Sequence, residues 1–278
     1  MDQGIPDVAV MQIVIPTRGR THQQLTLQAL PRELRKRTTL VCPKREASGL
    51  FRLYGDVEIV VQPDATMTIA RKREWIMREW LRCGYDKILM LDDDLVFSTR
   101  KSADDWHLDP IHGDELGAEI KRLEEKLGPE FPHVGFGARQ GNHNQEAGWR
   151  TPSRMMYSLG YYLSIVVKEC ELGRIETRED MDITLQLLRK GYQNAVWHTT
   201  VHDQQRDAPG GCNLWRTTAS SNANAHELAR LHQGYVSVRE KAYKAGPRVE
   251  VRCAWQKALE DGRKEKFAAH QELSEAAE

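Results

Sequence analysis

Three adjacent aspartates, Asp92, Asp93 and Asp94, directly follow the apolar run Lys87–Leu91. Neighbouring carboxylates repel one another at neutral pH unless a cation or strong hydrogen-bond donors offset their charge. Alternate residues of an extended chain face the same side, so Asp92 and Asp94 could address one cleft. Such oxygen ligands suit Mg²⁺ or Mn²⁺ held jointly with substrate phosphates. Solvated acids at a helix start are the alternative, but the apolar strand before the triplet favours a metal.

Two later segments carry further groups that could act in catalysis. The pattern predicts a helix over Arg178–Lys190, with Glu179 and Asp180 in its first turn. The ordinary explanation for these two acids is that the helix dipole stabilises carboxylates at a helix start. The alternative is that one of them is a general base, which deprotonates an acceptor hydroxyl. His202, at the end of a predicted strand, could complete a metal shell or bind phosphate, although a lone histidine is usually structural.

Arginines lie at two places where a phosphate could bind. Arg18 and Arg20 occupy the first loop, and Arg71 and Arg73 lie in the helix after Asp64. Guanidinium groups pair bidentately with phosphates, although exposed helical arginines are usually only solvated. The first loop lacks the Gly-Lys-Ser/Thr ending of a P-loop, and the first turn lacks GxGxxG. A dinucleotide-binding dehydrogenase is therefore disfavoured.

Strands and helices alternate in the first hundred residues. Strands are predicted at Met11–Pro16, Thr39–Cys42, Val57–Val61 and Lys87–Leu91, and helices at Thr21–Leu34 and Thr66–Arg82. This alternation predicts an α/β fold with a mostly parallel sheet flanked by helices on both faces. Ligands of such sheets bind beyond the carboxyl ends of the strands. The first loop and the aspartate triplet would both lie at that edge.

The second half is predicted to be more irregular. It comprises a charged stretch Ser98–Pro132 with a solvated helix Asp114–Leu127, a loop-rich acceptor region Val134–Ser164, a final strand Tyr192–His202, a Gly-rich segment Ala208–Thr218, and helices Ala223–Ala245 and Ala254–Glu278. We divide the chain into a catalytic domain, 1–207, and an extension, 208–278. The domain has a donor half, about 11–97, and an acceptor half, about 133–207. The extension holds the Gly-rich lid segment and the C-terminal helices.

Composition narrows the class of protein. The 278 residues carry 40 basic and 40 acidic side chains, so binding to a polyanion would need a local patch. Five widely spaced cysteines without a CxxC pair are typical of reduced thiols in the cytoplasm. No signal peptide and no run of roughly 20 apolar residues is found, so we expect no membrane association. The sequence carries no signal for the oligomeric state.

The order of these features resembles the GT-A glycosyltransferases, with their Rossmann-like fold. The resemblance covers about residues 11–205 and is strongest to the inverting family that includes cellulose and chitin synthases. It implies that the nucleotide-sugar contacts Pro16, Thr17, Arg18, Arg20, Asp64, Arg71, Asp92 and Asp93. It also implies Asp180 as the base with Glu179 beside it, and Asp94, Asp92 and His202 as ligands of Mn²⁺ or Mg²⁺. The chain has no QxxRW segment, so polymer extrusion is not expected.

A narrower resemblance involves five segments. These are PTRGR (16–20), MLDDD (90–94), GARQGN (137–142), EDMDITLQLLR (179–189), and HDQQ with the later GGCNLWR (202–216). They look like the phage glycosyltransferases associated with TET/JBP-type dioxygenases. That resemblance implies transfer of a sugar from a UDP-sugar to 5-hydroxymethylpyrimidines, chiefly 5-hydroxymethylcytosine, in phage DNA in the cytoplasm of an infected bacterium.

Contacts with DNA and closure over the donor are assigned to two stretches. The candidate acceptor residues are Arg139, Asn142, Trp149, Arg150 and Arg154, which offer cations for phosphates, an amide for a base edge and a ring for stacking. A loop packed under the sheet or a donor lid is the alternative. The candidate lid residues are Gly210, Gly211, Trp215 and Arg216, which could close over the diphosphate.

Three rival functions stay open at this stage. The same enzyme class could act on a glycan, a protein, a lipid-linked sugar or a small molecule. A nucleotidyltransferase also uses a metal and carboxylates on an α/β sheet, but the first loop lacks its Gly-rich, Lys-bearing cradle. A nucleic-acid-binding module without catalysis would not need the aspartate triplet.

Overall fold

The first half of the chain builds a parallel sheet. The computed structural model describes residues 10–204, 217–242 and 246–275. Its first four strands are β1 (Gln12–Pro16), β2 (Thr38–Cys42), β3 (Glu58–Val61) and β4 (Lys87–Leu91). They pair in the order β3-β2-β1-β4, all parallel. Strands β1, β2 and β4 are buried almost throughout, as expected for a sheet covered on both faces.

The second half extends this sheet to ten strands in the described part of the chain. The added strands are β5 (Leu95–Thr99), β6 (Asp109–Ile111), β7 (His133–Ala138), β8 (Trp149–Arg150), β9 (Ser158–Tyr162) and β10 (Asn194–Gln204). Strand β9 runs antiparallel between β4 and β7, and β7 and β10 are parallel neighbours. From these pairings, only β5, β8 and β9 run against the other seven. The predicted α/β fold with a mostly parallel sheet is confirmed.

The stretch predicted to be rich in loops contains strands. Val134–Ser164 holds most of β7 and all of β8 and β9. The loop-rich prediction was wrong because glycine was taken as a loop signal. At Gly135 of β7, a Cβ atom would lie 2.2 Å from the Ser158 carbonyl oxygen. Glycine is required there by the close approach of β9.

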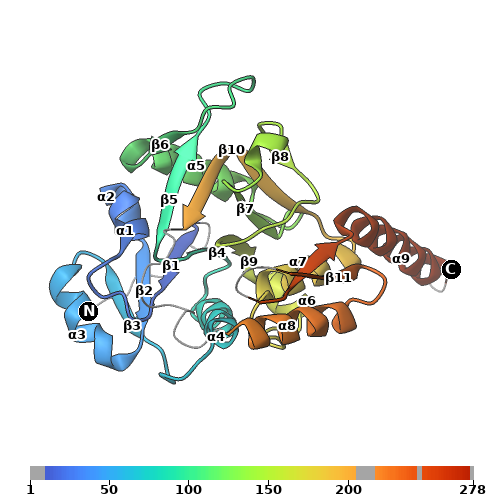
Figure 1. Ribbon diagram of the computed structural model, residues 1–278, viewed down its shortest axis with the longest axis horizontal. Coiled ribbons are helices and arrows are strands. Elements are labelled where there is room, and N and C mark those ends of the chain that lie inside the picture. Colours follow the sequence, from blue (N-terminus) through green and yellow to red (C-terminus); the bar gives the residue numbers. More distant parts are fainter. Residues whose placement is uncertain (1–9, 205–216, 243–245, 276–278) are drawn as a thin grey trace.

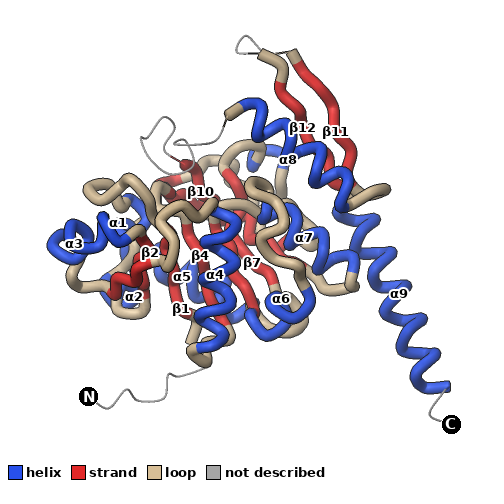
Figure 2. Tube along the Cα trace, turned by 90° about the horizontal axis from the view of Figure 1, so that it is seen from below, coloured by secondary structure: helices blue, strands red, loops and turns tan. Residues whose placement is uncertain are grey.

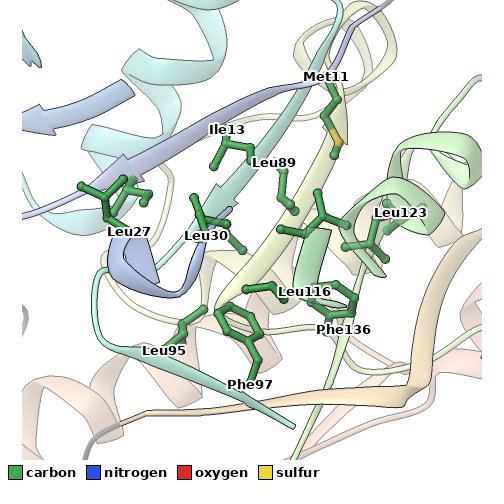
Figure 3. Close-up of a cluster of buried hydrophobic side chains, with 14 of the residues drawn as sticks. Met11, Ile13, Leu27, Leu30, Leu89, Leu95, Phe97, Leu116, Leu123 and Phe136 are labelled. Atoms are coloured by element: carbon green, nitrogen blue, oxygen red, sulfur yellow. The ribbon is translucent and has the colours of Figure 1, made fainter. Parts of the chain in front are cut away.

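Helices cover both faces of the sheet (Figures 1 and 2). One face carries α1 (Leu25–Ala29), α2 (Arg32–Arg35), α3 (Lys44–Leu53) and α5 (Gly113–Lys126), and the other carries α4 (Ile69–Arg82), α6 (Leu163–Glu169) and α7 (Glu179–Arg189). Figure 3 shows the core on the first of these faces, which includes Leu27 of α1 and, farther along the sheet, Leu116 beside Phe136. This packing gives the strand ends a rigid support.

Two helix predictions in this layer need correction. Thr21–Leu34 is not one helix, because Leu30 precedes Pro31 and takes an extended conformation (φ −72°, ψ 142°) that separates α1 from α2. Helix α5, predicted to be solvated, buries Leu116, Ile120 and Leu123 along one face.

A third layer lies outside α7 and consists of the C-terminal elements. These are α8 (Thr218–Leu231), β11 (Val236–Lys241), β12 (Arg248–Cys253) and α9 (Trp255–Glu275). The predicted helix Ala223–Ala245 was wrong beyond Leu231, since Gly234 (φ 80°) turns the chain into a β-hairpin. Helix α9 crosses α7 at Gly262, where a Cβ atom would lie 2.3 Å from the Leu188 carbonyl oxygen. Among the described residues, no helix has the length and apolar character to cross a membrane.

Candidate active site

The ends of β1, β4 and β10 meet at the carboxyl edge of the sheet. The Thr17–Arg20 loop follows β1, the aspartate triplet follows β4, and Gln204 ends β10. Thr26 of α1 fixes the triplet's backbone, because its hydroxyl donates to the Asp92 carbonyl (2.5 Å) and accepts from the Leu95 amide (2.9 Å). This is the edge where open α/β sheets bind ligands.

Asp93 joins the triplet to the first loop. Its carboxylate accepts from the Thr17 hydroxyl (2.5 Å) and is ion-paired with Arg20, which also reaches Asp94 at 3.0 Å. Burial raises the pKa of Asp93, while Arg20 and Thr17 oppose that rise. Both oxygens of this 3% exposed residue therefore have partners inside the protein. Asp93 supports the loop, so a direct nucleotide contact requires those partners to be exchanged.

Asp92 and Asp94 point toward a common atom, as their spacing predicts. Gln204 Nε2 lies 3.0 Å from Asp92 Oδ2 and 3.4 Å from Asp94 Oδ1. Burial and the charge of Asp92 raise the pKa of Asp94 to about 6. The Gln204 amide thus occupies a point addressed by two carboxylates, and Asp92 is the most open of the three, with a 19% exposed side chain.

Arg73 connects the triplet to the helix that carries the candidate base. Its guanidinium lies 2.5 Å from Asp92 Oδ1 and is also ion-paired with Glu179. Arg71, the predicted phosphate ligand, instead pairs with Glu74 on the surface, with a 60% exposed side chain. Arg73 is therefore the arginine of this helix that the structure brings to the site. Its signal in the sequence was an arginine in the apolar stripe with Ile69, Ile76 and Trp80.

Glu179 and Asp180 differ in their surroundings. Glu179 is 6% exposed and bound to Arg73, and burial raises its pKa to about 7. Asp180 is partly exposed, and its Oδ1 accepts the Met181 amide at 2.8 Å. Burial raises the pKa of Asp180, while the charges of Arg73 and Arg154 oppose the rise. Asp180 is the more accessible carboxylate at the start of α7.

His202 is buried on β10, two residues before Gln204. Its Nδ1 lies 3.2 Å from the Ser158 hydroxyl, and its Nε2 has no hydrogen-bond partner among the described residues. Burial lowers the pKa of His202 to about 3, so the ring is neutral and an acceptor. His202 and Gln204 share one face of β10 because side chains alternate along a strand. Within the described residues, however, no three acidic, histidine or cysteine side chains converge as a metal site would require.

Side-chain hydrogen bonds hold the first loop at the edge of the sheet. Lys72, which is 3% exposed, donates from Nζ to the Thr17 carbonyl (3.0 Å), and burial lowers its pKa to about 8. Arg18 donates weakly to the Met67 carbonyl (3.4 Å), and the exposed Asp64 caps its own turn at Thr66. Lys72 and Gln204 were not among the predicted site residues. The sequence held a signal for each of them. Lys72 lies in the buried stripe of its helix, and Gln204 lies two positions after His202, on the same face of an extended chain.

Comparison with known families now decides the class. The sequence model of the TET-Associated Glycosyltransferase family matches residues 11–211, well over half of the chain. The chain belongs to the TET-associated glycosyltransferase family. The family resemblance seen in the sequence is thereby confirmed, and the protein is a transferase of glycosyl groups. A comparison with curated proteins finds no match.

Solved structures resemble this glycosyltransferase only distantly. A197 from STIV has a TM-score of 0.38 with 11% identity over 71% of this chain and 86% of that one. A cytidylyltransferase from Leptospira borgpetersenii has a TM-score of 0.36 with 12% identity over 60% and 68%. A mannose-1-phosphate geranyltransferase from Thermus thermophilus has a TM-score of 0.34 with 17% identity over 81% and 64%. At these TM-scores the likenesses carry no functional argument.

The predicted acceptor residues of the glycosyltransferase occupy different environments. Asn142, in the short 3₁₀ helix Asn142–Asn144, is 1% exposed and bonds internally to Arg100 and the His198 carbonyl. Its contact with a base edge stays a prediction that would require these internal partners to be exchanged. Trp149 packs on Trp197, seven residues before the end of β10, which is roughly 20 Å from Gln204 at the usual strand rise.

The other predicted acceptor residues lie nearer to solvent, and the predicted lid residues lie outside the part of the chain that the structure describes. Arg139 donates to the Ser98 hydroxyl (3.2 Å), and its amide binds the His202 carbonyl. Arg150 is exposed and contacts Gln145. Arg154 is exposed, and its charge acts on Asp180. The lid residues Gly210, Gly211, Trp215 and Arg216 lie outside the described residues.

Proposed function

We propose that this glycosyltransferase transfers a sugar from a UDP-sugar to the hydroxymethyl group of a 5-hydroxymethylpyrimidine, chiefly 5-hydroxymethylcytosine, in phage DNA. One observation carries the proposal: Asp92 and Asp94 address a single point, and Arg73 ties Asp92 to the start of the helix that bears Asp180. The residues proposed to bind the donor and the proposed base are thereby connected through Arg73. The host cytoplasm is the compartment in which such DNA is exposed.

The donor half of the site supports a nucleotide diphosphate. Arg18 and Arg20 offer cations at the loop after β1, and Asp64 offers an exposed carboxylate at the turn after β3. A nucleoside diphosphate needs cations that pair with its phosphates. It also needs an acceptor, such as a carboxylate, for the hydroxyl groups of the ribose or for the base. The pyrophosphate would lie between this loop and Asp92.

The donor set at the tip of β4 fits Mn²⁺ or Mg²⁺. Asp92 and Asp94 supply hard oxygen ligands around the point now taken by the Gln204 amide, and the unpartnered Nε2 of His202 is neutral. These ligands would come together only if Gln204 turned aside. Bound there, the cation would neutralise charge on the leaving diphosphate.

The remaining chemistry belongs to Asp180. Its carboxylate takes the proton of the acceptor hydroxyl, whose oxygen forms a bond to the anomeric carbon. The bond from that carbon to the diphosphate oxygen breaks, and UDP leaves. Attack opposite the leaving group inverts the configuration of the anomeric carbon. Arg73 positions the base through Glu179 and partly offsets the rise in the pKa of Asp180 that burial causes.

The proposal is tested by mass spectrometry of hydroxymethylated and unmodified DNA after incubation with UDP-sugars and Mn²⁺. We expect a hexose adduct only on hydroxymethylated DNA, and its loss when the metal is chelated. Asp180→Asn should lower turnover by about 10²–10⁴-fold, because general base catalysis contributes that much.

Glu176→Gln is the matched control, since Glu176 is an exposed acid three residues before α7. It should leave turnover unchanged. Full turnover by Asp180→Asn would remove the base assignment. Donor hydrolysis without any DNA adduct would instead favour a glycan, protein or small-molecule acceptor.

A further inference from the structure

The C-terminal β-hairpin has one strongly basic face. In its register Ser237 pairs with Arg252, Arg239 with Glu250, and Lys241 with Arg248. Cross-strand partners share a face, so Arg239, Lys241, Arg248 and Arg252 lie together with a single acid, Glu250. Arg239, Arg248 and Arg252 are exposed, and Lys241 is paired with Glu250 at 2.7 Å. We call these four cations and Glu250 the basic ribbon face.

The opposite face of the hairpin is occupied by the protein itself. Val236, Val251 and Cys253 pack against the core between α7, α8 and α9, and Val249 is 6% exposed. The hairpin is therefore oriented by its apolar face, which leaves the basic ribbon face to solvent. In a chain with zero formal net charge, such a concentration of cations is a local feature.

The hairpin is tied to the helix that carries the candidate base. Asn222 of α8 binds the Val249 amide of β12 (3.0 Å), while Asn224 of the same helix binds the Glu176 amide just before α7 (3.1 Å). Charges of Arg154, Asp180 and Arg178 act on the pKa of Cys253, which burial raises to about 12. The base of the ribbon thus lies beside Asp180. Figure 2 shows the hairpin projecting from the side of the molecule where β10 ends.

We infer that the basic ribbon face binds the phosphate backbone of duplex DNA and delivers a base to the site at Asp180. A two-stranded ribbon has dimensions that the major groove of DNA accepts, and cations at its rim meet phosphates on either side. This inference rests on the proposed function for the acceptor, but the binding step is independent of the sugar transfer. Arg154 is exposed, and its charge acts both on Cys253 of the hairpin and on Asp180.

Binding of the full chain to a labelled, unmodified duplex of about 20 base pairs tests the inference by fluorescence anisotropy across a salt series. The variant Arg239→Ser/Arg248→Ser/Arg252→Ser should weaken binding by roughly tenfold or more. It should also lower the slope of log affinity against log salt by about 2 to 3, because each lost phosphate contact removes about 0.9. The single variant Arg239→Ser should lower that slope by about 1.

Arg32→Ser/Lys36→Ser/Arg52→Ser is the control, because it removes the same charge from exposed positions on α2 and α3. It should bind DNA as the wild type does. Thermal unfolding midpoints near that of the wild type exclude misfolding of either variant. Unchanged affinity and salt slope in the ribbon variant would overturn the inference, as would tighter binding of single strands than of duplex.

The outcomes also separate this inference from the proposed function. If the wild type glycosylates hydroxymethylated DNA but the ribbon variant binds duplex normally, only the ribbon assignment is wrong. If the ribbon variant loses binding while no UDP-sugar yields an adduct on any DNA, the ribbon stands and the acceptor chemistry is wrong. A wild type that binds no duplex even at about 50 mM salt, where phosphate contacts are strongest, contradicts both.

Discussion

Arg73 shows how one buried charge organises this site. It is 4% exposed and contacts carboxylates from two distant segments, Asp92 and Glu179. Burial disfavours its charged form, but the two carboxylates outweigh this effect and raise the pKa of Arg73. The guanidinium therefore stays charged, and the carboxylates on either side depend on it.

We expect Arg73→Met to lower the free energy of unfolding by about 3–5 kcal/mol, since it leaves buried carboxylates without their counter-ion. Arg71→Met should change it by less than about 1 kcal/mol, because exposed ion pairs contribute little. Urea unfolding followed by circular dichroism gives both values. The double variant Arg73→Met/Glu179→Gln should recover part of the loss. Equal effects at residues 71 and 73 would contradict the assigned roles.

The two arginines also show what the sequence can predict about this site. Residue types predicted the aspartate triplet and the first loop as parts of one site, because each directly follows an apolar strand, and the structure brings these two segments together. The pattern did not distinguish Arg71 from Arg73, since the choice depends on which side of α4 faces β4. The pattern also gave no sign that Asn142 is buried, because its burial involves Arg100, which is distant in sequence.

At the scale of elements, α7 is held by the C-terminal layer. His232, immediately after α8, lies 2.7 Å from Asp182 of α7, and Arg174 binds the same carboxylate. His232 and Asp182 are 0% and 2% exposed in their side chains. Asp182 follows Asp180 by two residues, so this contact fixes the helix turn that carries Asp180, the proposed base.

His232→Ala should lower the free energy of unfolding by about 2–4 kcal/mol, because it removes a buried hydrogen bond to a charged group. His226→Ala, at an exposed position of the same helix, should have almost no effect. Chemical denaturation of both variants gives the comparison. A similar loss at both positions would contradict a specific role for the contact between His232 and Asp182, because alanine favours a helix more than histidine does.

The parallel strands and their helices were predictable at this scale, whereas the hairpin was not. Alternating apolar runs and amphipathic helices report local periodicity, which is why β1, β4 and α4 were recognised. Strands β7 and β9 contain glycines that close packing requires. The pattern of polar and apolar residues does not change between α8 and β11, so the sequence gives no sign of the strand. Their assignment depends on partners elsewhere in the chain.

At the scale of the whole molecule, the described residues form three hydrophobic cores, and the third joins the C-terminal layer to α7. Met181, Leu185 and Leu188 of α7 pack with Leu228 of α8 and Leu259 of α9. Ile183 and Leu187 of the same helix pack toward the sheet. Helix α7 is therefore shared between the catalytic sheet and the C-terminal layer.

We expect thermal unfolding to show one transition at the same midpoint by far-ultraviolet circular dichroism and by tryptophan fluorescence. The reason is that α7 cannot lose one core without exposing the other. Removal of residues 218–278 should give an insoluble or largely unfolded product, because the outer side of α7 would be exposed. Two separate transitions, or a folded truncated chain, would mean that the extension is an independent domain.

The contact at Gly262 sets a tolerance on this arrangement. Even one added carbon at residue 262 would collide with the backbone of Leu188 and Arg189. The close spacing between α9 and α7 therefore requires a residue without a side chain at this position. Any bulk introduced there must displace one of the two helices. The position of α7, and with it of Asp180, the proposed base at its start, thus depends on a glycine in the last helix of the described chain.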